Sequence, residues 1–375
     1  GTSYKVPLDE LRKKGDVSNV ANVAALFAAT HARDNQLFQT LGYSTEGVGA
    51  NLYRYDASST ATIDGGFVQP GIGGTLSFSG ATFNGTSGTG RFIAVEQSEC
   101  NTDKFGSVSG SDIYGPLSRA IASASTVGSA LSTVTIPKGL YTLSAPVSIS
   151  TSGAHLKIRG LHPRSTTITA SASIASMLSI GDNSGVFSRI VIENILFNQN
   201  NLATIGIDAT YTRYSTIQHC EVSGTPSSGI AIKCGRWVNR ILNNELNGEW
   251  SGSEQGTGIE VPNDAINNLV IQNNSITSFN IGLRCLAGAN MMEISSNTFE
   301  ACDKAAIYLA EGCRQIVIER NYFETCGTAS DASGVAVDVV GGGTANYAAP
   351  IVAEWSQGGS LFLQGLIVNR NQFSD

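Results

Sequence analysis

The chain has 375 residues, of which 41% are hydrophobic and 14% charged, and its formal net charge at pH 7 is −7. This length and composition suffice for one large or two ordinary domains, and they exclude intrinsic disorder, which needs low hydrophobicity with high charge. The acidic balance without a basic patch argues against a nucleic-acid partner, and the lack of an apolar run of about 18 residues or more argues against membrane insertion.

Glycine and cysteine usage adds two constraints. With 42 Gly, 9 Pro and few charges, the composition favours many short strands joined by tight turns. The seven cysteines are odd in number and form no CxxC motif, so neither a zinc site nor a full disulfide framework is expected. Cys302 and Cys326 recur in "FEAC" and "FETC", which predicts stacked buried thiols, with disulfide pairing as the alternative. No cofactor or metal is predicted, and nothing indicates calcium.

The N-terminal part is expected to precede a larger domain. Residues 1–40 contain an Ala-rich stretch and are predicted to be mostly helical, and residues 41–98 to form a small β-rich module. The remaining domain, 99–375, opens with "DIYGPLSRAIASAS", an amphipathic helix expected near 112–125 with Asp112 at its start. This helix is suited to cover the end of the core that follows it.

A repeat of about two dozen residues runs through the second half of the chain. Each copy holds an apolar residue, an asparagine-like position three residues later and another apolar residue two further on. The asparagine-like positions are Ile195, Cys220, Asn244, Asn274, Asn297, Asn321 and, after a double interval, Asn371. Apolar residues alternate within each piece, which indicates strands, and a fixed period is typical of a solenoid.

A second strand opens the following turn of each copy, in "GIDA", "GIAI", "GIEV", "GLRC", "AIYL", "GVAV" and "SLFL". Its first inward residue is read as Ile207, then Ile230, then Ile259. Such coils stack as parallel strands about 4.8 Å apart. Asparagine suits the corners because it tolerates the left-handed conformation and its amides can hydrogen-bond from coil to coil. The predicted fold is an all-β, right-handed, single-stranded parallel β-helix.

These strands and asparagine corners resemble the pectin-lyase-like superfamily, which includes polygalacturonases, pectate lyases and phage tailspikes. The resemblance covers about residues 100–375. Nearer the start, "NLYRYDAS", "DGGFVQP", "KFGSVSG" and "VTIPKGLYTL" are similar to segments of phage tailspikes and tail depolymerases. The resemblance implies a polysaccharide ligand, a virion-surface or extracellular location, and a chain compatible with a homotrimer.

The candidate site lies on the "GIDA" face, because in pectin-lyase-like enzymes the outward residues of these strands form the substrate face. One outward row is read as Asp208, Ala231, Glu260, Arg284 and Tyr308. Lys233 is placed in the row two residues further on. Arg284 matches an arginine of the polygalacturonase strand "GIRIK", but the aspartates of that family are missing, so its mechanism is not expected.

The predicted catalytic residues are Glu260, Asp208, Arg284 and Tyr308. Glu260 and Asp208 are two coils apart, about 9–10 Å by the stacking distance, which is near the separation of about 6.5–9.5 Å found in inverting glycoside hydrolases. Alternatively, a Tyr or Lys base, with Arg284 neutralising a uronate carboxylate, suits β-elimination. A third interpretation is a surface ion pair between Glu260 and Arg284 that stabilises little.

One longer loop points to the same place. The interval from Asn244 to Asn274 is 30 residues, and the additional residues fall within 247–258. This loop is expected to overhang Glu260, where Trp250 can stack on a sugar ring or instead anchor the loop. The predicted substrate-binding residues are Lys233, Trp250, Glu249 and Glu254.

The predicted function is an extracellular or virion-borne protein that binds a polysaccharide and cleaves it, as a hydrolase or a lyase. The alternative is a glycan-binding adhesin or structural tail protein without catalysis. Carboxylates within reach of one another in an open groove favour the enzyme. Carboxylates that are all paired or covered favour the binding protein.

Overall fold

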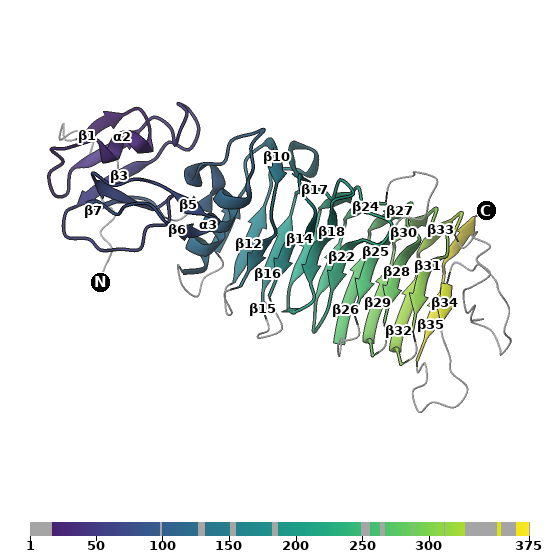
Figure 1. The fold of residues 1–375 in the computed structure, drawn as a ribbon. Coiled ribbons are helices and arrows are strands. Elements are labelled where there is room, and N and C mark those ends of the chain that lie inside the picture. Colours follow the sequence, from purple (N-terminus) through teal and green to yellow (C-terminus); the bar gives the residue numbers. More distant parts are fainter. Residues whose placement is uncertain are drawn as a thin grey trace. The chain divides into compact units, whose positions relative to one another are not determined.

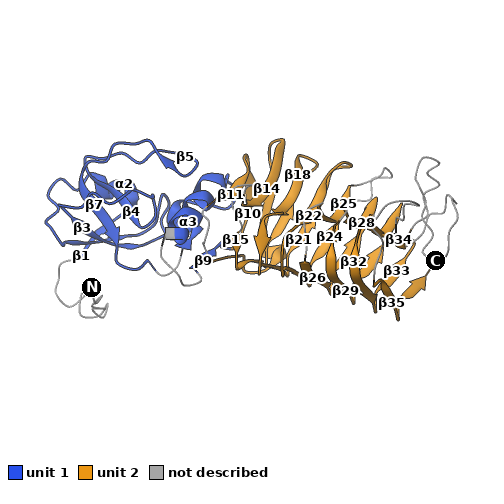
Figure 2. Ribbon diagram, turned by 90° about the horizontal axis from the view of Figure 1, so that it is seen from below, with its two compact units in different colours: residues 1–127, 132–137 blue, residues 128–131, 138–375 orange. Residues whose placement is uncertain are grey.

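The computed structural model describes residues 17–97, 100–126, 132–150, 155–181, 187–248, 256–262, 267–286, 288–310, 312–326, 351–353 and 365–374. The chain forms two compact units, residues 1–127 with 132–137 and residues 128–131 with 138–375 (Figure 2). No helix within the described ranges is long and apolar enough to cross a membrane.

The first unit contains a five-stranded sheet of order β1-β2-β3-β7-β4. Its strands are β1 (Val17–Val20), β2 (Leu37–Thr40), β3 (Leu52–Asp56), β4 (Val68–Ile72) and β7 (Thr89–Ala94). β1 and β2 pair in parallel, with helix α2 (Val23–Phe27) between them in sequence, and the other neighbours pair antiparallel. Phe92 anchors the core, with its ring centroid 5.3 Å from that of Phe38 and 5.0 Å from that of Tyr55.

The expectation of a mostly helical segment over residues 1–40 is wrong for its described part, 17–40. That part holds two strands and a single helix of five residues, capped by Asn22, whose side chain accepts a hydrogen bond from the Ala25 backbone N–H. After Phe27 the sequence offers no large apolar residue until Leu37, so a longer helix would have no apolar stripe to bury. Because β2 pairs with β3, residue 40 is not a boundary between compact units.

The rest of the first unit is made of short elements and one longer helix. These elements are β5 (Phe78–Ser79), β6 (Thr82–Phe83), β8 (Cys100–Asn101), η1 (Thr102–Phe105), α3 (Tyr114–Thr126) and β9 (Ser132–Thr135). The helix expected near 112–125 is confirmed as α3, and Asp112 accepts a hydrogen bond from the Tyr114 backbone N–H at 3.0 Å. Its predicted apolar face is buried, with Leu117, Ile121 and Ala124 all below 5% exposed. α3 belongs to the first compact unit, whereas the sequence placed it in the following domain.

The second unit is a parallel β-helix whose coils each contribute strands to three sheets (Figure 1). The β10 sheet contains β10 (Gly139–Leu143), β13 (Thr166–Ala170), β17 (Leu196–Asn198), β21 (Glu221–Ser223), β24 (Glu245–Asn247), β27 (Ser275–Thr277), β30 (Thr298–Glu300), β33 (Tyr322–Glu324) and β36 (Gln372–Ser374). The β11 sheet contains β11 (Val147–Ile149), β14 (Ile174–Ile180), β18 (Ala203–Ala209), β22 (Ile230–Cys234), β25 (Thr257–Val261), β28 (Ile281–Cys285), β31 (Ala305–Leu309) and β34 (Ile351–Ala353). Within this unit the β12 sheet contains β12 (Leu156–Arg159), β16 (Ile190–Glu193), β20 (Thr216–Gln218), β23 (Arg240–Leu242), β26 (Asn267–Gln272), β29 (Asn290–Ser295), β32 (Arg314–Glu319) and β35 (Ile367–Asn369).

The predicted all-β solenoid is therefore confirmed, and its core is built as the repeat indicated. The apolar residues three before the asparagine-like positions are buried in consecutive coils at Ile192, Ile217, Ile241, Ile271, Ile294 and Ile318. Phenylalanines two residues after those positions stack face to face, with ring centroids 5.3 Å apart between Phe299 and Phe323. All seven cysteines are free thiols, and burial raises the pKa of Cys220 and of Cys234 to about 12.

The asparagines form the predicted ladder along the solenoid. Asn274 Oδ1 accepts hydrogen bonds from the backbone N of Asn244 at 2.9 Å and from its Nδ2 at 3.0 Å. Asn274 Nδ2 also donates to the backbone carbonyl of Ile241 at 2.9 Å. The same bonds recur through Asn297, Asn321 and Asn371. The amides thus satisfy backbone groups buried at the corner.

The ladder asparagine was expected to adopt the left-handed conformation at its corner. In the structure the residue before it does so. φ is +56° at Asn273, Ser296 and Arg320, whereas the asparagines that follow them are not among the residues with positive φ. The sequence "NN" at 243–244 and 273–274 conceals this division. Serine and arginine at the first position show that it tolerates other residues, while from Asn244 to Asn371 the second position supplies the amide of the ladder.

Candidate functional site

Five polar side chains lie in one row on the β11 sheet. The strand register pairs Asp208 with Lys233, Lys233 with Glu260, Glu260 with Arg284, and Arg284 with Tyr308. We call these five residues the Asp208–Tyr308 row. Figure 1 shows the strands that carry them, β18, β22, β25, β28 and β31, in succession along the unit. Neighbouring members are one coil apart, about 4.8 Å at the backbone.

The register corrects the expected row in one coil, where Lys233 replaces Ala231. Ile207 pairs with Ile232, not with Ile230, so the motif "GI" at 229–230 lies two residues too early. A Cβ added to Gly206 would lie 2.6 Å from the backbone oxygen of Ala231, so this position of the coil requires a small residue. In β22 this position is occupied by Ala231, which is small enough. The sequence reading used Gly229 instead, which lies two residues earlier.

Glu260 is the most enclosed member of the row, with 4% of its surface exposed. Arg284 donates to its Oε2 from Nε at 3.0 Å, and the Arg284 Nη2 contacts the same oxygen. Lys233 Nζ lies 3.5 Å from the other oxygen, Oε1. The predicted ion pair between Glu260 and Arg284 is thus present, but it is a three-member cluster, and its carboxylate is nearly buried. Removing either cation would leave one oxygen of this poorly solvated carboxylate without its partner.

Asp208 differs from Glu260 because one of its oxygens is available. Its Oδ1 accepts hydrogen bonds from the backbone N of Thr210 at 3.1 Å and from its Oγ1 at 2.6 Å. Its Oδ2 makes no hydrogen bond with any residue that the structure describes. Thr210 therefore fixes the orientation of the carboxylate and leaves an acceptor for a ligand, two coils from Glu260.

The cations of the row also keep donors for a ligand. The Lys233 side chain is 26% exposed and that of Arg284 is 35% exposed. Tyr308 is half-buried and follows Arg284 in register. The row can therefore bind hydroxyl and carboxylate groups.

Of the other predicted site residues, Trp250, Glu249 and Glu254 lie outside the described residues. In the described part of the chain, no group of three or more His, Cys, Asp or Glu side chains is placed to hold a metal ion.

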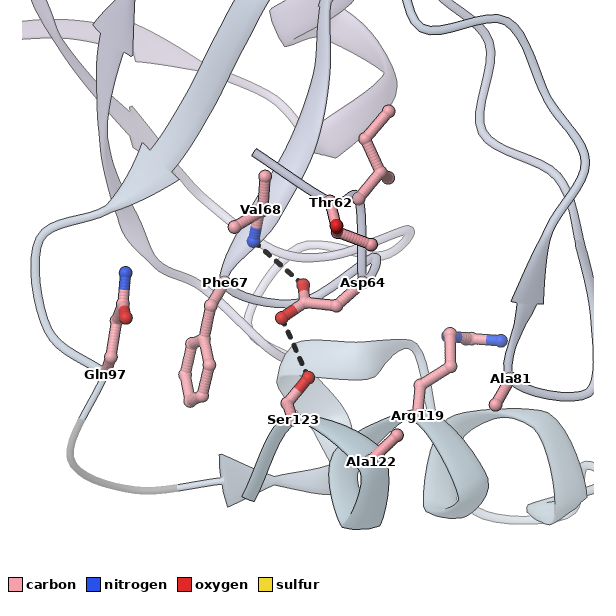
Figure 3. A pocket seen from close by; sticks show the side chains of 10 residues that line it. Thr62, Asp64, Phe67, Val68, Ala81, Gln97, Arg119, Ala122 and Ser123 are labelled. Carbon is pink, nitrogen blue, oxygen red and sulfur yellow. Dashed lines mark hydrogen bonds between the residues drawn. The ribbon is translucent and has the colours of Figure 1, made fainter. Parts of the chain in front are cut away.

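A cavity that was not predicted lies wholly within the first unit (Figure 3). It has a volume of about 270 Å³ and is lined by residues of 62–68, Ala81, Gln97 and α3. Its carboxylate, Asp64, accepts hydrogen bonds from Ser123 Oγ at 2.7 Å and from the backbone N–H groups of Gly66 and Val68. Asp64 thereby ties its loop to α3, which gives it a structural role.

One group of surface residues in the second unit also escaped the sequence analysis. Tyr211, Arg213, Tyr214, Arg236 and Trp237 lie where the β11 sheet turns toward the β12 sheet, in two consecutive coils. We call them the aromatic corner. The available signal was "YTRY" at 211–214 followed one period later by "GRW" at 235–237.

Comparisons with known proteins agree with this architecture. Residues 238–353 match the family model described as the right handed beta helix region. The solenoid is thus a right-handed parallel β-helix. No curated protein matches the chain significantly.

Solved structures of the same architecture are distant in sequence. The gp42 tailspike of Acinetobacter phage vb_AbaP_AS12 is similar with a TM-score of 0.62 and 14% identity, over 85% of this chain and 59% of that one. WceF of Pantoea stewartii, a glycan biofilm modifying enzyme, is similar with a TM-score of 0.48 and 12% identity, over 82% of this chain and 47% of that one. The endo-xylogalacturonan hydrolase of Aspergillus tubingensis is similar with a TM-score of 0.48 and 10% identity, over 72% of each chain. This chain spans less than two thirds of the tailspike, and the likeness concerns the fold.

Proposed function

We propose that the protein binds a polysaccharide across the Asp208–Tyr308 row and cleaves it. The observation that carries the proposal is the row itself, since the fold stacks residues about a hundred positions apart in sequence into one polar strip. Over five coils the strip extends about 19 Å, which suits a chain of sugars better than a single small molecule. The fold shared with a phage tailspike supports a location at the virion surface or outside the cell.

Asp208 is the catalytic carboxylate of this proposal. Its Oδ2 is available, whereas both oxygens of Glu260 face cations. In hydrolysis, Asp208 takes a proton from water, and the water oxygen bonds to the anomeric carbon. The bond from that carbon to the glycosidic oxygen breaks, and the leaving oxygen takes a proton from solvent. Glu260 then holds Lys233 and Arg284 in position against the substrate.

Elimination is the other chemistry that the row supports. Arg284 would neutralise a uronate carboxylate, and Lys233 or Tyr308 would remove the adjacent ring proton. The bond from the neighbouring ring carbon to the glycosidic oxygen would break, leaving a double bond in the sugar, and the oxygen would leave with a proton. The two reactions differ in their products, because only elimination creates an unsaturated uronate.

One observation favours a second function, glycan binding without cleavage. Glu260 is almost fully enclosed and paired on both oxygens, which is the arrangement of a structural ion cluster. In this case Lys233 and Arg284 only bind the glycan.

A panel of acidic and neutral polysaccharides distinguishes the two functions. The enzyme hypothesis predicts new reducing ends, with ultraviolet absorbance of unsaturated uronates added if the reaction is elimination. Retention in affinity electrophoresis without either product would leave only the binding function. The absence of both retention and products on every polysaccharide would refute both functions.

We further propose a homotrimer, for which light scattering should give three times the chain mass of 39.2 kDa.

A further inference from the structure

The aromatic corner carries two exposed aromatic residues, Tyr214 and Trp237, on neighbouring coils. An isolated parallel bridge pairs Arg213 with Trp237, and the Tyr214 backbone N–H donates to the Trp237 carbonyl at 3.0 Å. Tyr214 is 57% exposed and Trp237 is 38% exposed. Large aromatic side chains are usually buried, because they carry much apolar surface. Two exposed aromatic residues on neighbouring coils give this outer corner flat surfaces on which ligand faces can pack.

A buried asparagine holds this corner rigid. Asn239, 3% exposed, donates from Nδ2 to the backbone carbonyls of Thr212 at 2.9 Å and Gly235 at 2.5 Å. Its Oδ1 accepts from the backbone N of Ser215 at 3.0 Å. One side chain therefore ties together the two loops that carry the aromatic residues. A preordered surface loses little conformational entropy when it binds a ligand.

Among the described residues, the corner and its neighbouring coil carry three arginines, Arg189, Arg213 and Arg236. The Arg236 guanidinium lies 5.4 Å above the centre of the Tyr211 ring. Arg213 makes no ion pair with the described residues, and its Nε is buried without a hydrogen-bond partner. Arg189 is exposed one coil earlier, where its backbone N–H donates to the Arg213 carbonyl at 3.1 Å. It too makes no ion pair in the described part of the chain. Guanidinium groups suit planar carboxylates, which they can bind with two parallel hydrogen bonds.

We propose that the aromatic corner is a non-catalytic subsite for an acidic polysaccharide, with sugar rings packed on Tyr214 and Trp237 and sugar carboxylates bound by Arg213 and Arg189. The inference rests on the proposed polysaccharide function and specifies its substrate class. The corner lies on the same coils as the Asp208–Tyr308 row, since Tyr211 follows Asp208 by three residues and Arg236 follows Lys233 by three. A nucleic acid is the less suitable ligand, because the chain carries a net charge of −7.

Affinity electrophoresis tests the subsite with alginate, polygalacturonate and hyaluronan as acidic probes, and with dextran as the neutral probe. We expect the wild-type chain to bind at least one acidic probe and not dextran. Trp237→Ala and Tyr214→Ala should each weaken that binding about fivefold, as expected for loss of one packed ring. Arg213→Gln should weaken it and reduce its dependence on salt concentration.

Met291→Ala is the matched control. Met291 is 47% exposed and has a left-handed φ of +56°, as Tyr214 has one of +53°, and the register places it in the equivalent position three coils further on. Its loss should leave binding unchanged. Circular dichroism and thermal melting of each variant separate loss of the subsite from loss of the fold.

Three outcomes would overturn the subsite. These are no binding to any acidic probe, undiminished binding by Trp237→Ala and Tyr214→Ala, or tighter binding to single-stranded DNA than to the acidic probes. Product release from short oligosaccharides is measured as well, because it tests the proposed function independently of the subsite. Corner variants should keep that activity, whereas Asp208→Asn should lose it.

Discussion

At the scale of single residues, Asn273 and Asn274 show how adjacent, chemically identical side chains have different functions. Asn273 adopts the left-handed conformation, with φ of +56°, at the corner of the coil. Asn274 has its amide buried in the ladder, where Oδ1 accepts two hydrogen bonds from Asn244. In this coil the first residue adopts the left-handed conformation and the second supplies a ladder amide, so substitutions should separate the two roles.

Asn274→Ala should lower the free energy of unfolding by about 2–3 kcal/mol, because it leaves two buried donors of Asn244 without an acceptor. Asn273→Ala should cost about 1 kcal/mol, since alanine disfavours the left-handed conformation. Asn273→Gly should be nearly neutral because glycine has no such restriction, while Asn274→Gly should be at least as harmful as alanine. Urea titration of the four variants measures this, and equal losses at both positions would contradict it.

At the scale of strands, a buried carboxylate links three coils of the β12 sheet. Glu193 on β16 is 8% exposed and lies 2.5 Å from Lys157 Nζ on β12 through Oε1. Gln218 on β20 donates to its Oε2 at 2.9 Å. Burial alone would raise the pKa of Glu193, but the hydrogen bonds from Lys157 and Gln218 and the nearby positive charges outweigh it, and the pKa is lowered.

This shift predicts a pH-dependent contribution to stability. A carboxyl group whose pKa is lower in the folded state stabilises the fold above its unfolded pKa of about 4.3, and this contribution disappears as pH falls through the folded value. Glu193→Gln should therefore cost about 1–2 kcal/mol at pH 7, and the difference from wild type should shrink below about pH 4. Thermal melting of both proteins from pH 7 to pH 3 tests this. A difference independent of pH would contradict the assignment.

The strands were more predictable from the sequence than their register or the features between them. Alternating apolar residues around each ladder position specify the strand and its inward side, and these predictions are confirmed through Ile318. The exception is β22, where Ala231 occupies the small-residue position. The neighbouring "GI" at 229–230 led to a predicted register that is shifted by two residues. A shift of two residues preserves the alternation, so periodicity alone cannot detect it.

The aromatic corner could not be predicted by the same reasoning. Tyr214 and Trp237 lie outside the strands of the repeat, at corner positions that accept many residue types. Nothing in one sequence distinguishes an exposed aromatic residue from a buried one at such a corner. Only the coil-to-coil pairing of Arg213 with Trp237 brings the two segments together.

At the scale of the whole molecule, the solenoid stacks residues that are far apart in the sequence in neighbouring coils. Asp208 and Tyr308 are 100 positions apart in the chain and four coils apart on the β11 sheet. The proposed polysaccharide function depends on this stacking. It requires the five members of the row to act on one ligand, with Asp208 as the member that has an available carboxylate oxygen.

The most direct test compares product release by Asp208→Asn with that by wild type on the polysaccharide that wild type hydrolyses. Glu300→Gln is the control, because Glu300 is an exposed carboxylate on another sheet, on β30. The account predicts a loss of about 100-fold or more for Asp208→Asn, with retention in affinity electrophoresis preserved and the control unchanged. Full activity of Asp208→Asn, or an equal loss in Glu300→Gln, would contradict it.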